Sequence, residues 1–307
     1  MAVYKKERFG IARKIVSNMT AESWETIPHA VVSYEADVTE FMKEYKKLNE
    51  GCTDKAKKIS INTVVMKIIC EGLMVAPKMN CHLKFERKLV RGKLYYHNRV
   101  NVSMPVVLPD GRMMTVNLRH MESKNLLKMT EIINDTMRRM QNTNMDEAMF
   151  EVSMDNTIKG LKKGKIKQAI YRLIGSKTGK HKVRTLKGEA KKKYYAIPEK
   201  DRLTKKDIEQ GTVTISNLGS IHRNQTGMCF LLEIIPPQVT AIAVNAIRKQ
   251  PTVVTDENGN DSIEIRQILP LTIAFDHKAL DYCDILPFMN RLDEIFENPS
   301  VIHSWKE

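Results

Sequence analysis

The residues best suited to chemistry are a histidine and an aspartate four positions apart, His277 and Asp281. An apolar run with strand-like alternation, 269–275, leads directly into the histidine, and a helical pattern follows the aspartate. A histidine at a strand end is held rigidly while its ring projects outward, and its ordinary pKa of about 6.5 lets it exchange protons at neutral pH. This context predicts a general base, although the spacing by itself favours an ordinary surface or core histidine.

The pattern around this pair predicts a mixed α/β chain. Helices are expected at 11–19, after Thr39, at 60–75, from Ser123 toward 140 and at 283–296, with Thr39 and Ser123 as helix caps. Strands are expected at 29–38, 83–85, 93–96, 100–108, 114–118, 212–216, 239–247 and 263–275, with a turn at 109–111. Because helices and strands do not alternate regularly, we expect a single domain, 1–307, built on a mixed sheet covered by helices.

The composition describes a globular chain whose 307 residues, 42% of them hydrophobic, can fill a core. No apolar run approaches the roughly 20 residues of a membrane-spanning helix, and the N-terminus lacks the apolar segment of a secretory signal. The five cysteines are scattered without any C-x-x-C pair, which argues against a disulfide framework and against a metal site. We therefore expect a reduced, cytoplasmic protein.

The positive charge is concentrated in one segment. The chain has a net charge of +14, and residues 159–193 contain fourteen Lys or Arg against the single acid Glu189, a net charge of 14 − 1 = +13. The rest of the chain is nearly neutral, at 14 − 13 = +1. The charge thus defines a basic helical insert, at about 155–200, and does not indicate a body that binds nucleic acid.

Two interpretations of this basic insert are open. Its apolar residues fall roughly on one helix face: Ile158, Leu161, Ile166, Ala169, Ile170, Leu173 and Ile174. A helical hairpin that packs this face against the protein and leaves its lysines in water is favoured, because charge runs are usually solvated. The alternative is peripheral contact with an anionic membrane surface, for which an apolar stripe among lysines is typical.

Five separated segments together resemble one family, in the same order along the chain. They are 11–19 with 27–29, 104–111, Gly-Thr-Val-Thr-Ile-Ser-Asn-Leu-Gly at 211–219, Ile-Pro-Pro-Gln-Val at 235–239, and 277–281. The family is the catalytic domain of dihydrolipoyl acyltransferases, the core components of 2-oxo acid dehydrogenase complexes, whose fold is shared with chloramphenicol acetyltransferase. The resemblance covers nearly all of the chain outside the insert.

The resemblance implies an acyltransferase that uses coenzyme A. His277 would be the general base and Ser216 the donor to the oxyanion, with the two residues facing each other across the subunit interface of a homotrimer. Asn217 and Gly219 would shape the loop that binds the cofactor, and Asp281 would orient the histidine, with Arg13 as a partner. A thiol needs such a base because the thiolate is the nucleophile. Apart from the resemblance, a further use of the basic insert is open, in which its lysines near the cleft attract the phosphates of coenzyme A.

The chain also departs from the family pattern. Tyr282 occupies the position of the family's glycine after the aspartate. The sequence begins directly with the first catalytic segment, so we expect no covalent lipoyl group on this chain. Thr-Asp-Lys-Ala at 53–56 matches the lipoylation tetrad, but it lies between two expected helices without flanking strands, and coincidence is the better interpretation.

The sequence therefore predicts an acyltransferase that moves an acyl group between coenzyme A and an acceptor thiol, hydroxyl or amine. One alternative is a separately encoded core subunit of a 2-oxo acid dehydrogenase complex, served by lipoyl domains in trans. Another is an inactive trimeric scaffold that binds a membrane or a partner through the insert. The presence of both His277 and Ser216 speaks against the scaffold.

Overall fold

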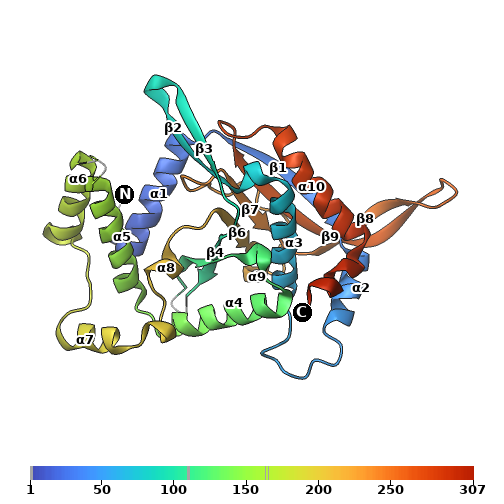
Figure 1. The fold of residues 1–307 in the computed structure, drawn as a ribbon, viewed down its shortest axis with the longest axis horizontal. Coiled ribbons are helices and arrows are strands. Elements are labelled where there is room, and N and C mark those ends of the chain that lie inside the picture. Colours follow the sequence, from blue (N-terminus) through green and yellow to red (C-terminus); the bar gives the residue numbers. More distant parts are fainter. Residues whose placement is uncertain (1–2, 109–110, 163, 165) are drawn as a thin grey trace. The chain divides into compact units, whose positions relative to one another are not determined.

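The computed structural model describes residues 3–108, 111–162, 164 and 166–307 (Figure 1). The chain forms two compact units: a helical unit of residues 1–22 and 135–210, and a sheet unit of residues 23–134 and 211–307. Helices α1 (Ile11–Thr26) and α4 (Leu126–Gln141) each contribute to both units. Within the described ranges, no helix is both long enough and apolar enough to cross a bilayer.

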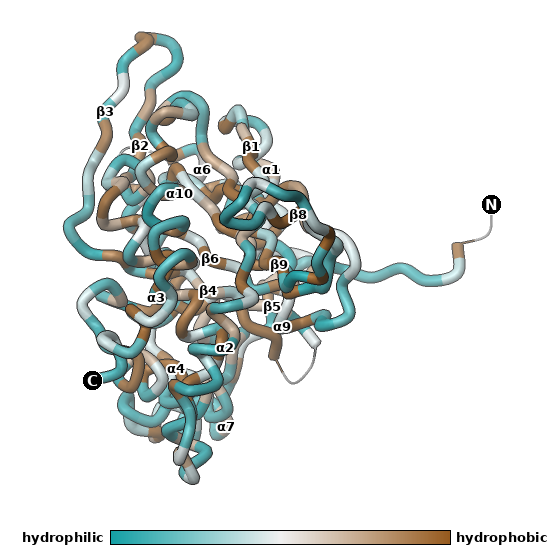
Figure 2. The backbone as a smooth tube through the Cα atoms, turned by 90° about the vertical axis from the view of Figure 1, so that its right-hand side faces the viewer, coloured by the Kyte–Doolittle hydropathy of each residue, from teal (hydrophilic) through white to brown (hydrophobic). Residues whose placement is uncertain are grey.

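The sheet unit is built on a mixed sheet with the strand order β1-β9-β7-β6-β4-β5 and with β8 paired to β9. Its strands are β1 (His29–Asp37), β4 (Val102–Val107), β5 (Met113–Leu118), β6 (Val213–Asn217), β7 (Thr240–Val244), β8 (Arg248–Thr255) and β9 (Asp261–Asp276). β6 is parallel to β4 and to β7, and the other pairs are antiparallel. Strands β4 and β6 contain hydrophobic residues (Figure 2). The expected mixed sheet is confirmed.

Two helices pack against each other beside this sheet, α3 (Ile61–Val75) and α10 (Tyr282–Glu297) (Figure 1). Their close approach requires Gly72, because a Cβ atom there would lie 2.6 Å from a ring carbon of Phe288 and 2.8 Å from a methyl group of Leu292. Helix α3 begins as expected, with the Ser60 hydroxyl accepting a hydrogen bond of 3.1 Å from the backbone N–H of Thr63. The long apolar side of α3 and one side of α10 thus form the core beside β1.

Both other expected helix caps are wrong. Helix α2 (Thr39–Leu48) begins with Thr39 itself, whose backbone N–H and hydroxyl donate to the carboxylate of Asp37 at 2.9 and 2.6 Å. Helix α4 begins at Leu126, where the side-chain oxygen of Asn125 accepts from the N–H of Lys128 at 2.8 Å. Ser123 instead closes a short 3-10 turn. Several Ser, Thr, Asp and Asn residues lie near each start, and any of them can cap a helix.

Two hairpins extend this unit. β2 (Cys81–Glu86) and β3 (Arg91–Tyr96) pair in a separate two-stranded sheet, at the positions expected. Strand β8 was not expected, and it pairs with the first half of β9, whose first five residues are exposed. The expected turn at 109–111 falls on residues 109 and 110, which lie outside the described residues.

The helical unit contains the basic insert and extends beyond it on both sides. Its helices are α5 (Met145–Lys162), α6 (Ile166–Lys177), α7 (Gly188–Ala196) and the short α8 (Lys205–Ile208). Glu147 on α5 is 1% exposed, and its carboxylate accepts hydrogen bonds from the N–H of Leu186 at 3.0 Å and the hydroxyl of Tyr195 at 3.1 Å. A carboxylate buried in this way is satisfied by its donors, and it fixes α7 to α5.

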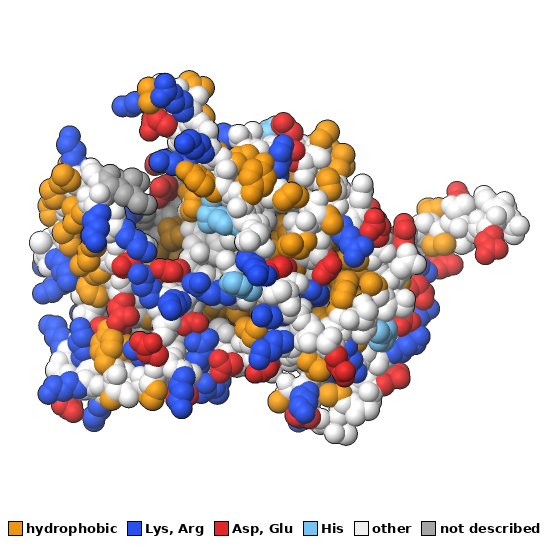
Figure 3. All heavy atoms as spheres, in the orientation of Figure 1, with side chains coloured by type: hydrophobic (Ala, Val, Ile, Leu, Met, Phe, Trp, Pro, Cys, Tyr) orange, Lys and Arg blue, Asp and Glu red, His pale blue; other side chains and the backbone are white. Residues whose placement is uncertain are grey.

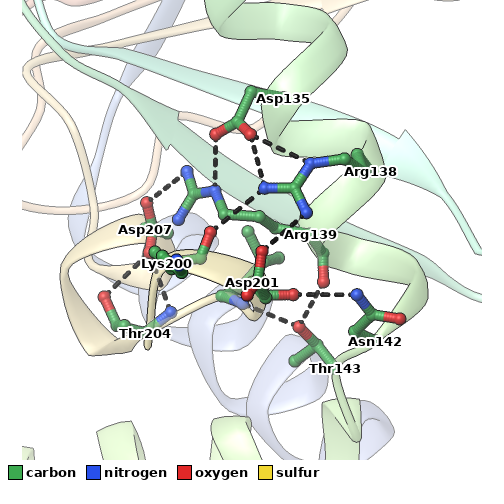
Figure 4. Close-up of polar contacts among 10 residues, drawn as sticks. Asp135, Arg138, Arg139, Asn142, Thr143, Lys200, Asp201, Thr204 and Asp207 are labelled. Atoms are coloured by element: carbon green, nitrogen blue, oxygen red, sulfur yellow. Dashed lines mark hydrogen bonds and ion pairs between the residues drawn. The ribbon is translucent and has the colours of Figure 1, made fainter. Parts of the chain in front are cut away.

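An ion-pair network fastens the end of this unit to α4 (Figure 4). The guanidinium of Arg139 lies 2.8 Å from the carboxylate of Asp135 and 3.0 Å from that of Asp207. The Arg138 guanidinium forms ion pairs with the carboxylates of Asp135, at 2.8 Å, and Asp201, at 2.9 Å. Burial opposes ionisation of Asp207, but hydrogen bonds from Arg139 and Thr204 outweigh it and hold the pKa of this carboxyl below its usual range. The chain that returns from the insert is therefore anchored by charge.

Candidate functional site

The segment around Ser216 ends a central strand. Ser216 lies on β6 and is 2% exposed, and Asn217 is the last residue of that strand. The Asn217 side-chain oxygen accepts from the N–H of Ser220 at 2.8 Å, and its amide nitrogen donates to the side-chain oxygen of Asn62 at 2.8 Å. The short helix α9 (Leu218–Ile221) follows directly. Asn217 thus joins the end of β6 to the start of α3.

Gly219 lets this turn lie against the next strand. A Cβ atom at Gly219 would lie 2.7 Å from the Cα and N atoms of Ala246 and from the carbonyl oxygen of Asn245. A side chain there would push the turn away from the chain that follows β7. The requirement is for space rather than for an unusual backbone angle, because Gly219 does not have a positive φ.

A pocket of about 580 Å³ opens beside this turn. Asn217, Gly219 and Ser220 line one side of it. Its lining also includes three cations that the sequence analysis did not select, Lys55, Lys58 and Arg223. Ser216 is not among the lining residues and lies buried next to them.

The pocket is suited to an anionic ligand. No acidic residue lines it, and within the described part of the chain Lys55, Lys58 and Arg223 form no ion pair. Three unpaired cations together with asparagine amides match the chemistry of a ligand that carries phosphates. Lys55 and Lys58 precede the cap of α3, and in the sequence they look like ordinary surface lysines.

His277 directly follows β9, where its backbone N–H donates to the carbonyl oxygen of Pro28 at 3.0 Å. Its side chain is 56% exposed. The Nδ1 atom lies 3.1 Å from the carbonyl oxygen of Leu280 and 3.3 Å from a carboxylate oxygen of Asp281. Because these oxygens can only accept, Nδ1 carries the proton and Nε2 keeps its lone pair. The geometry therefore leaves Nε2 able to act as a base.

Asp281 is also the N-cap residue of α10, and Tyr282 is the first residue of that helix, with about half of its surface exposed. The Asp284 carboxylate accepts from the backbone N–H of Asp281 at 3.0 Å and lies 2.7 Å from the Lys78 ammonium. The hydrogen bond from Asp281, followed by Lys78, holds the pKa of Asp284 below its usual range. The turn that carries His277 is thus fixed by the start of α10, and the proposed pairing of Asp281 with Arg13 stays a prediction.

The histidine of the first expected strand has a structural role. His29 Nε2 accepts from the backbone N–H of Ile234 at 3.2 Å, and the Ser23 hydroxyl lies 3.3 Å from the same atom. Burial lowers the pKa of His29, so its neutral form is favoured.

The structure does not bring Ser216 and His277 together within one chain. Ser216 pairs with Ala243 on β7, and Ala243 pairs with Thr272 on β9, which precedes His277 by five residues. At about 3.3 Å per residue, the two predicted site residues are separated by roughly 16 Å along the strand direction alone. A hydrogen-bonded reaction site needs atoms about 3 Å apart. The predicted site residues therefore fall into two groups within one chain, called half-sites below: Ser216 with Asn217 and Gly219, and His277 with Asp281.

Comparison with known families decides the assignment. The model of the 2-oxoacid dehydrogenases acyltransferase (catalytic domain) family matches residues 4–154 and 180–304. The chain belongs to this family. The resemblance seen in the sequence is confirmed, as is the expected assignment to an acyltransferase family. Residues 155–179, within the basic insert, are not matched.

Curated relatives and solved structures agree with this family. The acetyltransferase component of the pyruvate dehydrogenase complex from Rickettsia bellii is 23% identical over 291 residues, 94% of this chain and 52% of the relative. The mitochondrial component from Saccharomyces cerevisiae is 21% identical over 298 residues, 97% of this chain and 48% of the relative. The chain thus spans about half the length of the curated relatives it matches.

The fold is that of solved acyltransferase cores. The cubic core of a pyruvate dehydrogenase multienzyme complex has a TM-score of 0.66 at 17% identity, covering 98% of this chain and 94% of that one. The dihydrolipoamide acetyltransferase of Azotobacter vinelandii gives the same values. At this level of identity the likeness supports the fold alone.

Proposed function

We propose that this chain transfers an acyl group between coenzyme A and the thiol of a dihydrolipoyl group that a separate lipoyl domain presents. The observation that carries the proposal is the geometry of His277, whose Nδ1 faces the Leu280 carbonyl so that Nε2 is free to take a proton. The family supports the acyl transfer, and a dihydrolipoyl acceptor agrees with the names of the relatives. A cytoplasmic location remains a prediction.

The reaction needs one base and one oxyanion donor. His277 Nε2 takes the proton from the acceptor thiol, and the resulting thiolate attacks the carbonyl carbon of the thioester. The Ser216 hydroxyl would donate to the oxyanion of the tetrahedral intermediate. Collapse breaks the original carbon–sulfur bond, and the leaving thiolate regains the proton from His277. Asp281, 3.3 Å from Nδ1, stabilises the imidazolium that exists between these two proton transfers.

The pocket beside Asn217 and Gly219 would hold coenzyme A. Lys55, Lys58 and Arg223 suit its phosphates, and the pocket extends to the end of the strand that carries Ser216. In this position the ligand's thioester would approach the Ser216 half-site. The basic insert is not needed for this binding, because the pocket has its own cations.

The active form requires more than one copy of the chain. Because Ser216 and His277 lie at different positions along the sheet, the reaction site is complete only when the Ser216 half-site of one copy meets the His277 half-site of another. The resemblance to the family implies a homotrimer, in which three such sites form. An exposed apolar face on the β8–β9 hairpin, Val253, Ile263 and Ile265, is available for contacts between copies.

Thiol release from a panel of acyl-coenzyme A donors, with dihydrolipoamide as acceptor, tests the proposal. Hydroxyl and amine acceptors belong in the same panel, and His277→Ala is the comparison. Acceptor-dependent turnover with the dithiol that His277→Ala abolishes would support the proposal. If no donor and acceptor pair reacts above the variant's background, the proposal is wrong and the inactive trimeric scaffold becomes the better description.

A further inference from the structure

The basic insert exposes a row of apolar side chains. Ile166, Ile170 and Ile174 are spaced by four residues on α6, so they lie along one side of the helix, next to Tyr171. These four side chains, the apolar ridge, are between 48 and 74% exposed. Ala169, on another side of α6, is buried. The insert's apolar residues were expected to pack against the protein. Ala169 does so, whereas the apolar ridge is exposed.

The apolar ridge lies in the segment that carries the fourteen Lys and Arg residues, and Figure 3 shows blue and orange side chains mixed over the helical unit. Lys159 pairs with Asp155 at 3.0 Å, and Lys191 approaches Glu147 at 3.4 Å. Among the residues that the structure describes, the other Lys and Arg side chains of 159–193 form no ion pair with an acid. Most of the net charge of +13 in this segment is therefore open to an external anion.

The ridge is also separate from the segments that the family shares. All four ridge residues, together with the exposed Ile158 and Leu161 of α5, fall within 155–179, which the family model does not match. The acyl transfer proposed above uses none of them. A surface of this kind needs an occupant of its own.

We propose that α6 and the end of α5 dock the protein on an anionic phospholipid surface, with the apolar ridge at the level of the headgroups. Apolar side chains set among lysines are the composition of an interfacial helix. Protein–protein interfaces are depleted of lysine, which argues against a protein occupant. Nucleic acid would pair with the cations but would leave the isoleucines in water. A lipid surface satisfies both the charge and the apolar row.

Co-sedimentation of the full chain with vesicles tests this docking. We expect binding to vesicles of phosphatidylcholine mixed with phosphatidylglycerol and little binding to vesicles of phosphatidylcholine alone. Each basic residue near an anionic surface changes the partition coefficient about fivefold. Replacing Lys162, Lys167 and Arg172 by glutamine should therefore weaken binding by on the order of 100-fold, and raising the salt concentration should weaken it further.

The ridge needs its own variant and its own matched controls. The triple substitution Ile166→Ser, Ile170→Ser and Ile174→Ser should weaken vesicle binding at least tenfold with its charge unchanged. Leu89→Ser with Val90→Ser changes two apolar residues outside the insert that are more exposed than the ridge isoleucines, and Lys84→Gln, Lys88→Gln and Lys93→Gln removes three exposed cations there. Both controls should bind vesicles as the wild type does. Circular dichroism checks that each variant is folded.

Several results would overturn the docking proposal. One is the absence of binding to the anionic vesicles, and another is equal loss of binding in the charge control, which would indicate attraction by total charge. A change in oligomer size on ridge substitution, measured by light scattering, would assign the ridge to a contact between copies. Tighter binding to an RNA oligonucleotide than to vesicles would assign the cations to nucleic acid.

Discussion

The two half-sites of this chain are built on the same sheet but in opposite ways. Ser216 is 2% exposed at the end of a central strand, with β4 and β7 as neighbours. His277 is 56% exposed on a turn after β9, where its backbone N–H donates to Pro28 and the N–H groups of Ala279 and Leu280 donate to the carbonyl oxygen of Asp276. A group that only donates a hydrogen bond benefits from rigidity, whereas a base that serves an incoming thiol must be accessible. In the proposed function, the exposed His277 is the half-site that another copy of the chain would cover.

The strongest test of this comparison is complementation between two inactive variants. His277→Ala and Ser216→Ala, co-expressed with separate tags, should form mixed assemblies in which some sites join an intact histidine to an intact serine. Random pairing across an interface predicts about a quarter of wild-type sites, so activity should rise by on the order of 100-fold above either variant alone. The control is a mixture of the two separately purified variants, in which the assemblies do not exchange subunits. If the mixed assemblies are no more active than the two single variants, Ser216 and His277 do not combine across an interface between copies. The division into two half-sites would then be wrong.

Two hydroxyls on β6 give the next test. Ser216→Ala should lower kcat by on the order of 10² to 10³ with little change in KM, because its hydroxyl would act on the oxyanion only. Thr214→Val should behave differently, since the Thr214 hydroxyl donates to the buried side-chain oxygen of Gln238 at 2.7 Å. Losing that donor should cost about 1–3 kcal/mol of unfolding free energy.

Steady-state kinetics and thermal unfolding of both variants separate these effects. We expect Ser216→Ala to keep the wild-type Tm and Thr214→Val to keep the wild-type kcat at low temperature. If both variants lose stability and neither loses kcat, Ser216 is a structural residue and the Ser216 half-site is not catalytic.

A smaller effect is expected in the pocket. Lys55→Gln with Lys58→Gln should raise KM for acyl-coenzyme A by about 2- to 30-fold, because each of the two exposed ion pairs with a phosphate contributes roughly 0.2–1 kcal/mol. The kcat value should not change, and an acyl-pantetheine thioester without the nucleotide should react equally with both proteins. Lys84→Gln with Lys93→Gln on the β2–β3 hairpin is the matched control. An equal rise in KM in that control would show attraction by total charge and not a phosphate site.

The sequence predicted the scaffold better than the assembly of the site. The apolar alternation before His277 identified the buried half of β9, because a core strand leaves a strong local pattern. Strand β8 was missed because it pairs only with the exposed half of β9, and its own sequence, 248–255, is largely polar and contains Pro251. The separation of Ser216 from His277 is set by the register of β6, β7 and β9, and no local pattern encodes the pairing of strands far apart in the chain.

The cations of the pocket were missed for a related reason. Lys55 and Lys58 are ordinary surface lysines in the sequence, and they acquire a shared role only because the loop before α3 lies beside Asn217 and Arg223. Charge runs are usually solvated, so their composition carries no signal of a ligand. The helix caps at Thr39 and Ser123 failed because several neighbouring residues were chemically equivalent, and tertiary contacts chose between them.

The smallest expected effect concerns acid stability at the exposed half-site. The folded-state pKa of Asp284 lies below its usual value, first because of the backbone N–H of Asp281 and then because of Lys78. The stabilisation by Asp284 is therefore present above the unfolded pKa of about 3.9 and is lost as the pH falls through the lower folded value. Asp284→Asn should cost less than about 1 kcal/mol near neutral pH, because the pair with Lys78 is partly exposed.

Urea unfolding as a function of pH measures this difference, with Glu50→Gln as a control carboxylate on the surface. The curves of wild type and Asp284→Asn should converge only after the pH has fallen through the lowered folded pKa of Asp284, where both side chains are uncharged. The same substitution should lower kcat slightly, since Asp284 fixes the turn of Asp281 that orients His277. A difference in the free energy of unfolding that is the same at every pH would mean that the asparagine disturbs packing. The turn of His277 would then be held by the helix contacts and not by the charge of Asp284.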